Sequence, residues 1–165
     1  MQLFTIGYEG ASIEDFVETL DCLGVERVID IRDLPASRKR DFSKNILKQH
    51  LLDADMEYSH FKALGDPKEG REAMRAGDRA KFLEVFSAQM KKPEAESALE
   101  QLTSLVLDET CVLLCYERDY KNCHRSIVAR EIGRRSGLAI EHRGVCKGAN
   151  RVSLSVNGSA PEYAN

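Results

Sequence analysis

The chain has 165 residues and a formal charge of −3, and 42% of its residues are hydrophobic and 31% charged. This composition is typical of one soluble globular domain, and it excludes an intrinsically disordered chain. It also argues against a protein whose whole surface binds nucleic acid. The chain lacks the run of about 18 apolar residues that spans a membrane, and its N-terminus does not resemble a signal peptide. The five cysteines form no C-x-x-C pair, which favours free thiols, so we expect a cytoplasmic protein.

The first third of the chain alternates between apolar strands and amphipathic helices. A strand is predicted over residues 3–8, followed by a helix over 13–23 whose start Ser12 can cap. A second strand is predicted over 25–32, and a second helix over 43–55.

The same alternation continues to residue 143. A short strand is predicted over 56–61, and the polar, glycine-containing segment 64–78 is predicted to be a long loop. The remaining predicted elements are helices over 78–91 and 94–108, a strand over 111–116, a helix over 124–136 and a strand over 138–143.

This order of elements predicts an α/β fold, a single-domain three-layer sandwich with a mainly parallel sheet over residues 1–143. Residues 144–165 are expected to form a tail, with an edge strand at 151–156 before the chain frays. Ligands of such folds bind beyond the carboxyl ends of the strands. The polar clusters of this chain lie at those ends, so we expect the site there.

Three arginines at this edge predict a pocket for an anion. Arg32 follows the second strand, Arg38 comes shortly after, and Arg125 lies at the start of a helix, where unpaired N–H groups also favour negative charge. Asp30 or Asp33 could orient Arg32. The alternative is a solvated basic loop with a simple helix cap.

Two thiols accompany the arginines. Cys115 ends a strand, and Cys123 begins a helix, where the dipole and His124 are expected to lower its pKa. Glu117 can act as a general base, or it can pair with an arginine. We treat Cys115, Glu117, Cys123 and His124 as candidate catalytic residues, and packing of the two thiols as an equal alternative.

Further polar residues can reach the same edge. These are Tyr8, Tyr58 and His60. A metal site built from the cysteines and histidines is not predicted, because no interval between them matches a known zinc spacing. The sequence leaves the identity of any cofactor unknown.

The motifs "TIGYEG", "VIDIRDLPASRKRDFSK", "EYSHFKALG" and "LLCYERDYKNCHRSIVAREI" resemble those of the bacterial domain-of-unknown-function family four-eight-eight. The resemblance covers residues 3–143 and includes a Cys-x-Glu element followed by Cys-His-Arg. It supports the predicted fold but implies no activity. Members usually carry Leu-Gly-Gly where this chain has Leu64, Gly65 and Asp66. The chain also resembles, more distantly, rhodanese-type sulfurtransferases.

Three functions are consistent with these observations. The first is an anion pocket for phosphate or a nucleic-acid backbone, in an enzyme that acts on a phosphorylated or nucleic-acid substrate. The second is a cysteine-dependent enzyme similar to sulfurtransferases. The third is a non-catalytic module that binds a nucleotide or nucleic acid.

Overall fold

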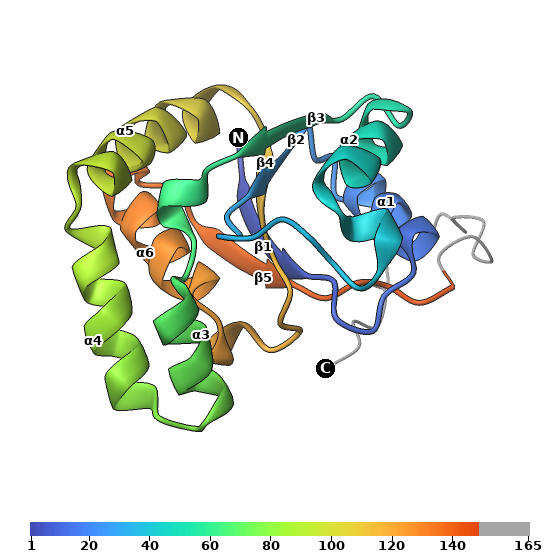
Figure 1. Cartoon of the computed structure of the whole chain (residues 1–165). Helices are drawn as coiled ribbons and strands as arrows, with labels where there is room; N and C mark the ends of the chain where they lie inside the picture. Colours follow the sequence, from blue (N-terminus) through green and yellow to red (C-terminus); the bar gives the residue numbers. More distant parts are fainter. Residues whose placement is uncertain (149–165) are drawn as a thin grey trace.

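Five parallel strands form the centre of the computed structural model, which describes residues 1–148 (Figure 1). The strands are β1 (Leu3–Gly7), β2 (Arg27–Asp30), β3 (Glu57–His60), β4 (Cys111–Cys115) and β5 (Ile140–Arg143). Their order in the sheet is β3-β2-β4-β1-β5, and all four pairings are parallel. The predicted α/β fold is therefore confirmed.

Helices cover both faces of the sheet. One face packs against α1 (Ile13–Cys22) and α2 (Lys44–Leu52). The other packs against α3 (Lys68–Arg75), α4 (Arg79–Met90), α5 (Pro93–Asp108) and α6 (Arg125–Ser136) (Figure 1). Successive strand residues alternate between the two cores, so Phe4 and Ile6 face α1 and α2 whereas Leu3 faces the opposite helices. None of the helices within residues 1–148 is long and apolar enough to cross a membrane.

Local sequence signals set several helix boundaries. The Ser12 hydroxyl accepts a hydrogen bond from the Asp15 backbone N–H at 3.1 Å and caps α1, as predicted. Pro93 occupies the first turn of α5, where a backbone N–H is not needed. Gly137 ends α6 in the left-handed conformation, at φ 76°.

The predicted loop over 64–78 is wrong, because this segment contains α3. The helix buries only Gly70 and Ala73 and leaves its many charged side chains outside, so it lacks the apolar stripe that identifies a helix in sequence. Gly70 packs closely against Asp66, because a Cβ atom there would lie 2.0 Å from Asp66 Oδ1 and would displace this side chain.

Residues beyond β5 pack against α1. Val145 is buried, and the Cys146 backbone N–H donates to the Thr19 hydroxyl at 2.9 Å. Residues 144–148 of the predicted tail therefore pack against the domain. The edge strand predicted at 151–156 lies outside the described residues.

Candidate functional site

The carboxyl ends of β1, β2 and β4 open onto a cavity of about 710 Å³. Six residues predicted from the sequence line it, namely Tyr8, Arg32, Arg38, Cys115, Glu117 and His124. A second cavity of about 520 Å³ has His124 and Glu117 in common with the first and is also lined by Cys123. The parallel topology thus gathers most of the predicted site at one edge of the sheet.

Cys115, Cys123 and His124 form a buried cluster at this edge. His124 Nδ1 lies 3.7 Å from the Cys115 sulfur and 3.8 Å from the Cys123 sulfur. The three residues are only 3%, 4% and 6% exposed, respectively. Cys115 comes from the end of β4, and the short helical turn Tyr120–Asn122 brings the other two back beside it.

The prediction that the pKa of the Cys123 thiol is lowered is wrong. Burial raises the pKa of Cys123 well above its usual value, and the neighbouring Cys115 raises it further, although His124 acts in the opposite direction. The Cys123 sulfur does accept the backbone N–H of Arg125 at 3.5 Å, as its place before α6 suggests. The single weak hydrogen bond does not offset the loss of solvent.

Glu117 and His124 are both charged groups of the cluster, because burial, which lowers the pKa of His124, is outweighed by Cys123, the Ile31 carbonyl and Glu117, which together raise it to about 9. Burial opposes the ionisation of Glu117, but hydrogen bonds from the Cys115 thiol, its own backbone and Cys123 outweigh this effect and lower the pKa of Glu117 below its ordinary value. Its Oε2 accepts from the Cys115 thiol at 2.8 Å. A carboxylate is therefore placed to take the proton of a thiol that faces the cavity.

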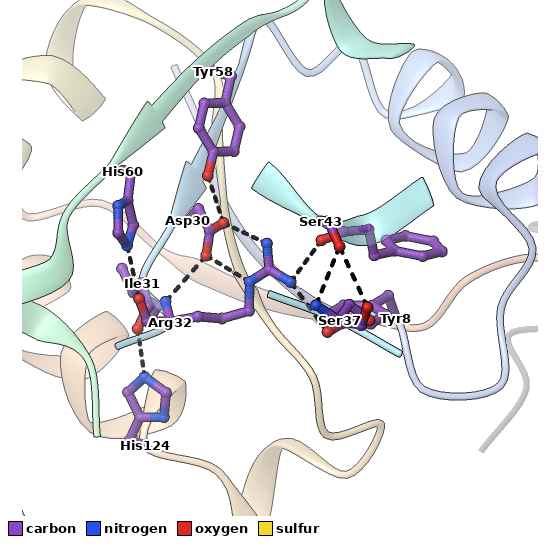
Figure 2. A network of polar contacts seen from close by, with 10 residues as sticks. Tyr8, Asp30, Ile31, Arg32, Ser37, Ser43, Tyr58, His60 and His124 are labelled. Atoms are coloured by element: carbon purple, nitrogen blue, oxygen red, sulfur yellow. Dashed lines mark hydrogen bonds and ion pairs between the residues drawn. The ribbon is translucent and has the colours of Figure 1, made fainter. Parts of the chain in front are cut away.

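Asp30, at the end of β2, orients Arg32 and Tyr58 (Figure 2). Its carboxylate accepts from Arg32 Nε at 2.9 Å and Nη2 at 2.6 Å, and from the Tyr58 hydroxyl at 2.6 Å. Arg32 Nη1 also donates to the Tyr8 hydroxyl and to the Phe42 carbonyl. Most donors of this buried guanidinium are thus engaged within the protein.

Two histidines hold the chain that follows β2 (Figure 2). Because backbone carbonyls only accept, His124 Nε2 donates to the Ile31 carbonyl and His60 Nε2 donates to the Arg32 carbonyl, each at 2.8 Å. His60 and Tyr58 line neither of the two cavities. Their role is therefore to hold Arg32 and Asp30 in position rather than to contact a ligand.

Arg125 also supports the loop around the site. It is 1% exposed, and its guanidinium donates to the Thr5 hydroxyl and to the Glu117 and Arg118 carbonyls. The first N–H groups of α6 also have partners within the chain, such as His124 O for Ile127. The geometry therefore does not support the expected role of Arg125 and the helix start in binding an anion.

Other cations are better placed on the cavity wall. Arg38 from the loop after β2 and Arg75 from α3 are exposed there. Within residues 1–148, neither guanidinium has a hydrogen-bond or ion-pair partner. Lys39 instead donates to the Ala11 carbonyl, and Arg71 pairs with Asp33 at 2.9 Å. The sequence did not indicate Arg75, because its helix was predicted to be a loop.

Asp66 is a further site residue that the sequence did not indicate. It is buried, lines both cavities, and its Oδ1 has no hydrogen-bond partner in the described part of the chain. Burial raises the pKa of Asp66 to about 6, against the opposing effects of His124 and Arg71.

These features define an α/β protein with a buried thiol, imidazole and carboxylate cluster at the carboxyl edge of a parallel sheet. A family model described as Domain of unknown function DUF488 matches residues 12–132. The chain therefore belongs to this family, as its motifs suggested. No curated protein and no solved structure matches the chain.

Proposed function

We propose that the chain is an enzyme that binds a small phosphate-bearing substrate in the 710 Å³ cavity. The observation that carries this proposal is a pair of arginines, Arg38 and Arg75, which have no partner within residues 1–148 and which line the same cavity as Cys115 and His124. Unpaired guanidinium groups beside a concave site favour a ligand with a compact negative charge.

Phosphate suits these groups for a geometric reason. A guanidinium presents parallel N–H donors that match two oxygens of a phosphate, and such charge-assisted bonds are stronger than neutral ones. Lys68 also lines the cavity, where its charge is paired with Glu72 at 3.7 Å, so the two arginines are the better candidates for a ligand. A small molecule is favoured over nucleic acid because the two arginines lie in a cavity and the chain carries a net charge of −3.

The reacting groups lie at the base of the cavity. Cys115, Glu117 and His124 line it, and the Glu117 carboxylate accepts a hydrogen bond from the Cys115 thiol. We assign Glu117 the role of general base toward a group that approaches Cys115. In this account Arg32 and Arg125 are positioning residues, since they hold the two loops that carry the cluster.

Sulfur transfer by Cys115 is the second candidate function. The hydrogen bond of 2.8 Å between its thiol and Glu117 favours it, because a nearby base activates a nucleophile. The Cys115 thiolate would attack the sulfane sulfur of thiosulfate, forming a cysteine persulfide and releasing sulfite. Production of thiocyanate from thiosulfate and cyanide, abolished in Cys115→Ala, would establish this activity.

Isothermal titration calorimetry tests the main proposal. Wild type, Arg38→Ala and Arg75→Ala are titrated with inorganic phosphate, nucleotides, sugar phosphates and a short single-stranded DNA. We expect a small phosphate-bearing compound to bind, and each variant to bind it roughly 10-fold to 100-fold more weakly, which corresponds to one charge-assisted hydrogen bond. Arg130→Ala, on the exposed side of α6, is the matched control. Identical affinities in all four proteins, or binding of DNA alone, would contradict the proposal.

Turnover separates an enzyme from a binding module. The compound that binds most tightly is incubated with wild type and with Glu117→Gln, and the products are followed by mass spectrometry. We expect conversion by wild type and its loss in Glu117→Gln. Binding without conversion would instead favour the non-catalytic module.

A further inference from the structure

We propose that Cys115, Cys123 and His124 form a binding site for a soft divalent metal ion, Zn²⁺ above all. The proposal concerns this cluster alone, and it does not depend on whether the cavity binds an anion. Its starting point is that the two sulfur atoms and one imidazole nitrogen all lie within 4.8 Å of one another.

The two distances from the imidazole nitrogen to the sulfur atoms are close to those of tetrahedral coordination. With Zn–S near 2.3 Å and Zn–N near 2.0–2.1 Å, a tetrahedral ion holds its sulfur and nitrogen ligands about 3.6 Å apart. His124 Nδ1 lies 3.7 Å from one sulfur and 3.8 Å from the other. All three side chains can thus reach one ion with only small movements.

The imidazole is already oriented as a ligand. Its Nε2 is engaged with the Ile31 carbonyl at 2.8 Å, so Nδ1 is the nitrogen that faces the two sulfurs. A hydrogen bond from the other ring nitrogen to a carbonyl is a regular feature of metal-binding histidines, where it sets the ring orientation. The second shell of the site is therefore in place.

The donor set selects the metal. Two thiolates and an imidazole suit Zn²⁺, whereas Mg²⁺ and Ca²⁺ require oxygen ligands. On binding, the ion replaces the two thiol protons and the proton on His124 Nδ1, and these protons pass to solvent, so the two thiolate charges balance the charge of the ion. Burial of the cluster, which opposes free thiolates, does not oppose this neutral unit.

Three protein ligands leave a fourth position open, as in catalytic rather than structural zinc sites. Cys115 and His124 line the larger cavity, and Cys123 and His124 line the smaller one, so an ion held by these residues would lie beside the space available to a substrate. Glu117, whose Oε2 lies 2.8 Å from the Cys115 sulfur, is the carboxylate that could accept a proton from a water bound to the ion.

Titration with Co²⁺ tests the site on the full chain, stripped of metal and kept reduced. We expect one Co²⁺ per chain, with the visible bands of tetrahedral cobalt and a near-ultraviolet thiolate charge-transfer band, both removed by added Zn²⁺. Cys115→Ala and Cys123→Ala are each expected to weaken Co²⁺ binding more than about 100-fold. This is a larger effect than the removal of a residue that only hydrogen-bonds to a metal ligand. Cys22→Ala, which removes an exposed thiol outside the cluster, should bind like wild type.

Circular dichroism shows whether each variant is folded, and if Cys123→Ala is not, Cys115→Ala and His124→Gln decide the outcome. Only octahedral bands, or unchanged cobalt spectra in folded Cys115→Ala, would overturn the proposal. Calorimetry with phosphate compounds on the metal-free protein is a separate measurement, so loss of the metal site and loss of the anion site are distinguished.

Discussion

His124 donates its Nε2–H to the Ile31 carbonyl at 2.8 Å, and this bond joins the start of α6 to the end of β2. The same side chain turns Nδ1 toward Cys115 and Cys123. One residue therefore sets both the separation of two loops and the arrangement of the cluster between them.

Replacing His124 by phenylalanine is expected to destabilise the metal-free protein by about 1–3 kcal/mol, because the Ile31 carbonyl loses its donor. Urea denaturation measures this change. His50→Phe is the control, since His50 only pairs with Asp41 at the surface and its loss should cost less than about 0.5 kcal/mol. Equal urea midpoints for the two variants would show that the hydrogen bond to Ile31 does not stabilise the fold.

Arg125→Met should destabilise the chain by about 2–4 kcal/mol, because the Glu117 and Arg118 carbonyls lose a charged donor. Arg130→Met changes the same residue type on the exposed side of the same helix and should have little effect. Thermal and urea unfolding compare the two. If Arg125 instead binds the ligand, Arg125→Met will lose phosphate affinity without losing stability.

Tyr58→Phe tests the network around Asp30. The hydroxyl donates to the buried carboxylate at 2.6 Å, so its removal should cost about 1–3 kcal/mol. Tyr120→Phe provides the matched control, because Tyr120 stacks on His142 through its ring. A phosphate affinity that falls in Tyr58→Phe while the unfolding free energy stays constant would contradict a supporting role.

Asp66 predicts a pH dependence of stability. Burial raises the pKa of Asp66 to about 6, so the folded protein binds this proton more tightly than the unfolded chain does. Stability from this group is therefore present at low pH and falls as pH rises from about 4 to about 6.

Asp66→Asn, which cannot ionise, should be more stable than wild type by about 1–3 kcal/mol at pH 7.5 and no more stable at pH 4. Urea denaturation at the two pH values measures this difference. Asp53→Asn, at an exposed position after α2, should show no such gain. A destabilised Asp66→Asn at pH 7.5 would mean that the ionised carboxylate is favoured in the fold.

The sequence predicted the fold well where apolar spacing was strong. Strands such as residues 111–115 are wholly buried, and α1 has both an apolar stripe and a serine cap, so each could be recognised locally. The helix α3 could not, because it buries only a glycine and an alanine. Because this helix was not predicted, Arg75 and the buried position of Asp66 were missing from the predicted site.

The candidate site was predicted in part. Cys115, Glu117, Cys123 and His124 could be found because they follow a buried strand and precede a helix. The separation between Cys115 and Cys123 matches no zinc spacing, so their convergence on one imidazole became evident only with the turn at Tyr120–Asn122 in place. The partners of Arg125 could not be predicted either, since Thr5 lies on a strand distant in sequence.

The affinity of Arg38→Ala/Arg75→Ala for the phosphate compound that wild type binds most tightly tests the central claim most directly. Calorimetry at low and moderate salt gives the comparison, with Arg130→Ala as the control. We predict that the double variant loses at least about 100-fold in affinity and most of the salt dependence, because both free guanidiniums on the cavity wall are gone. Wild-type affinity and an unchanged salt dependence in the double variant would contradict the account.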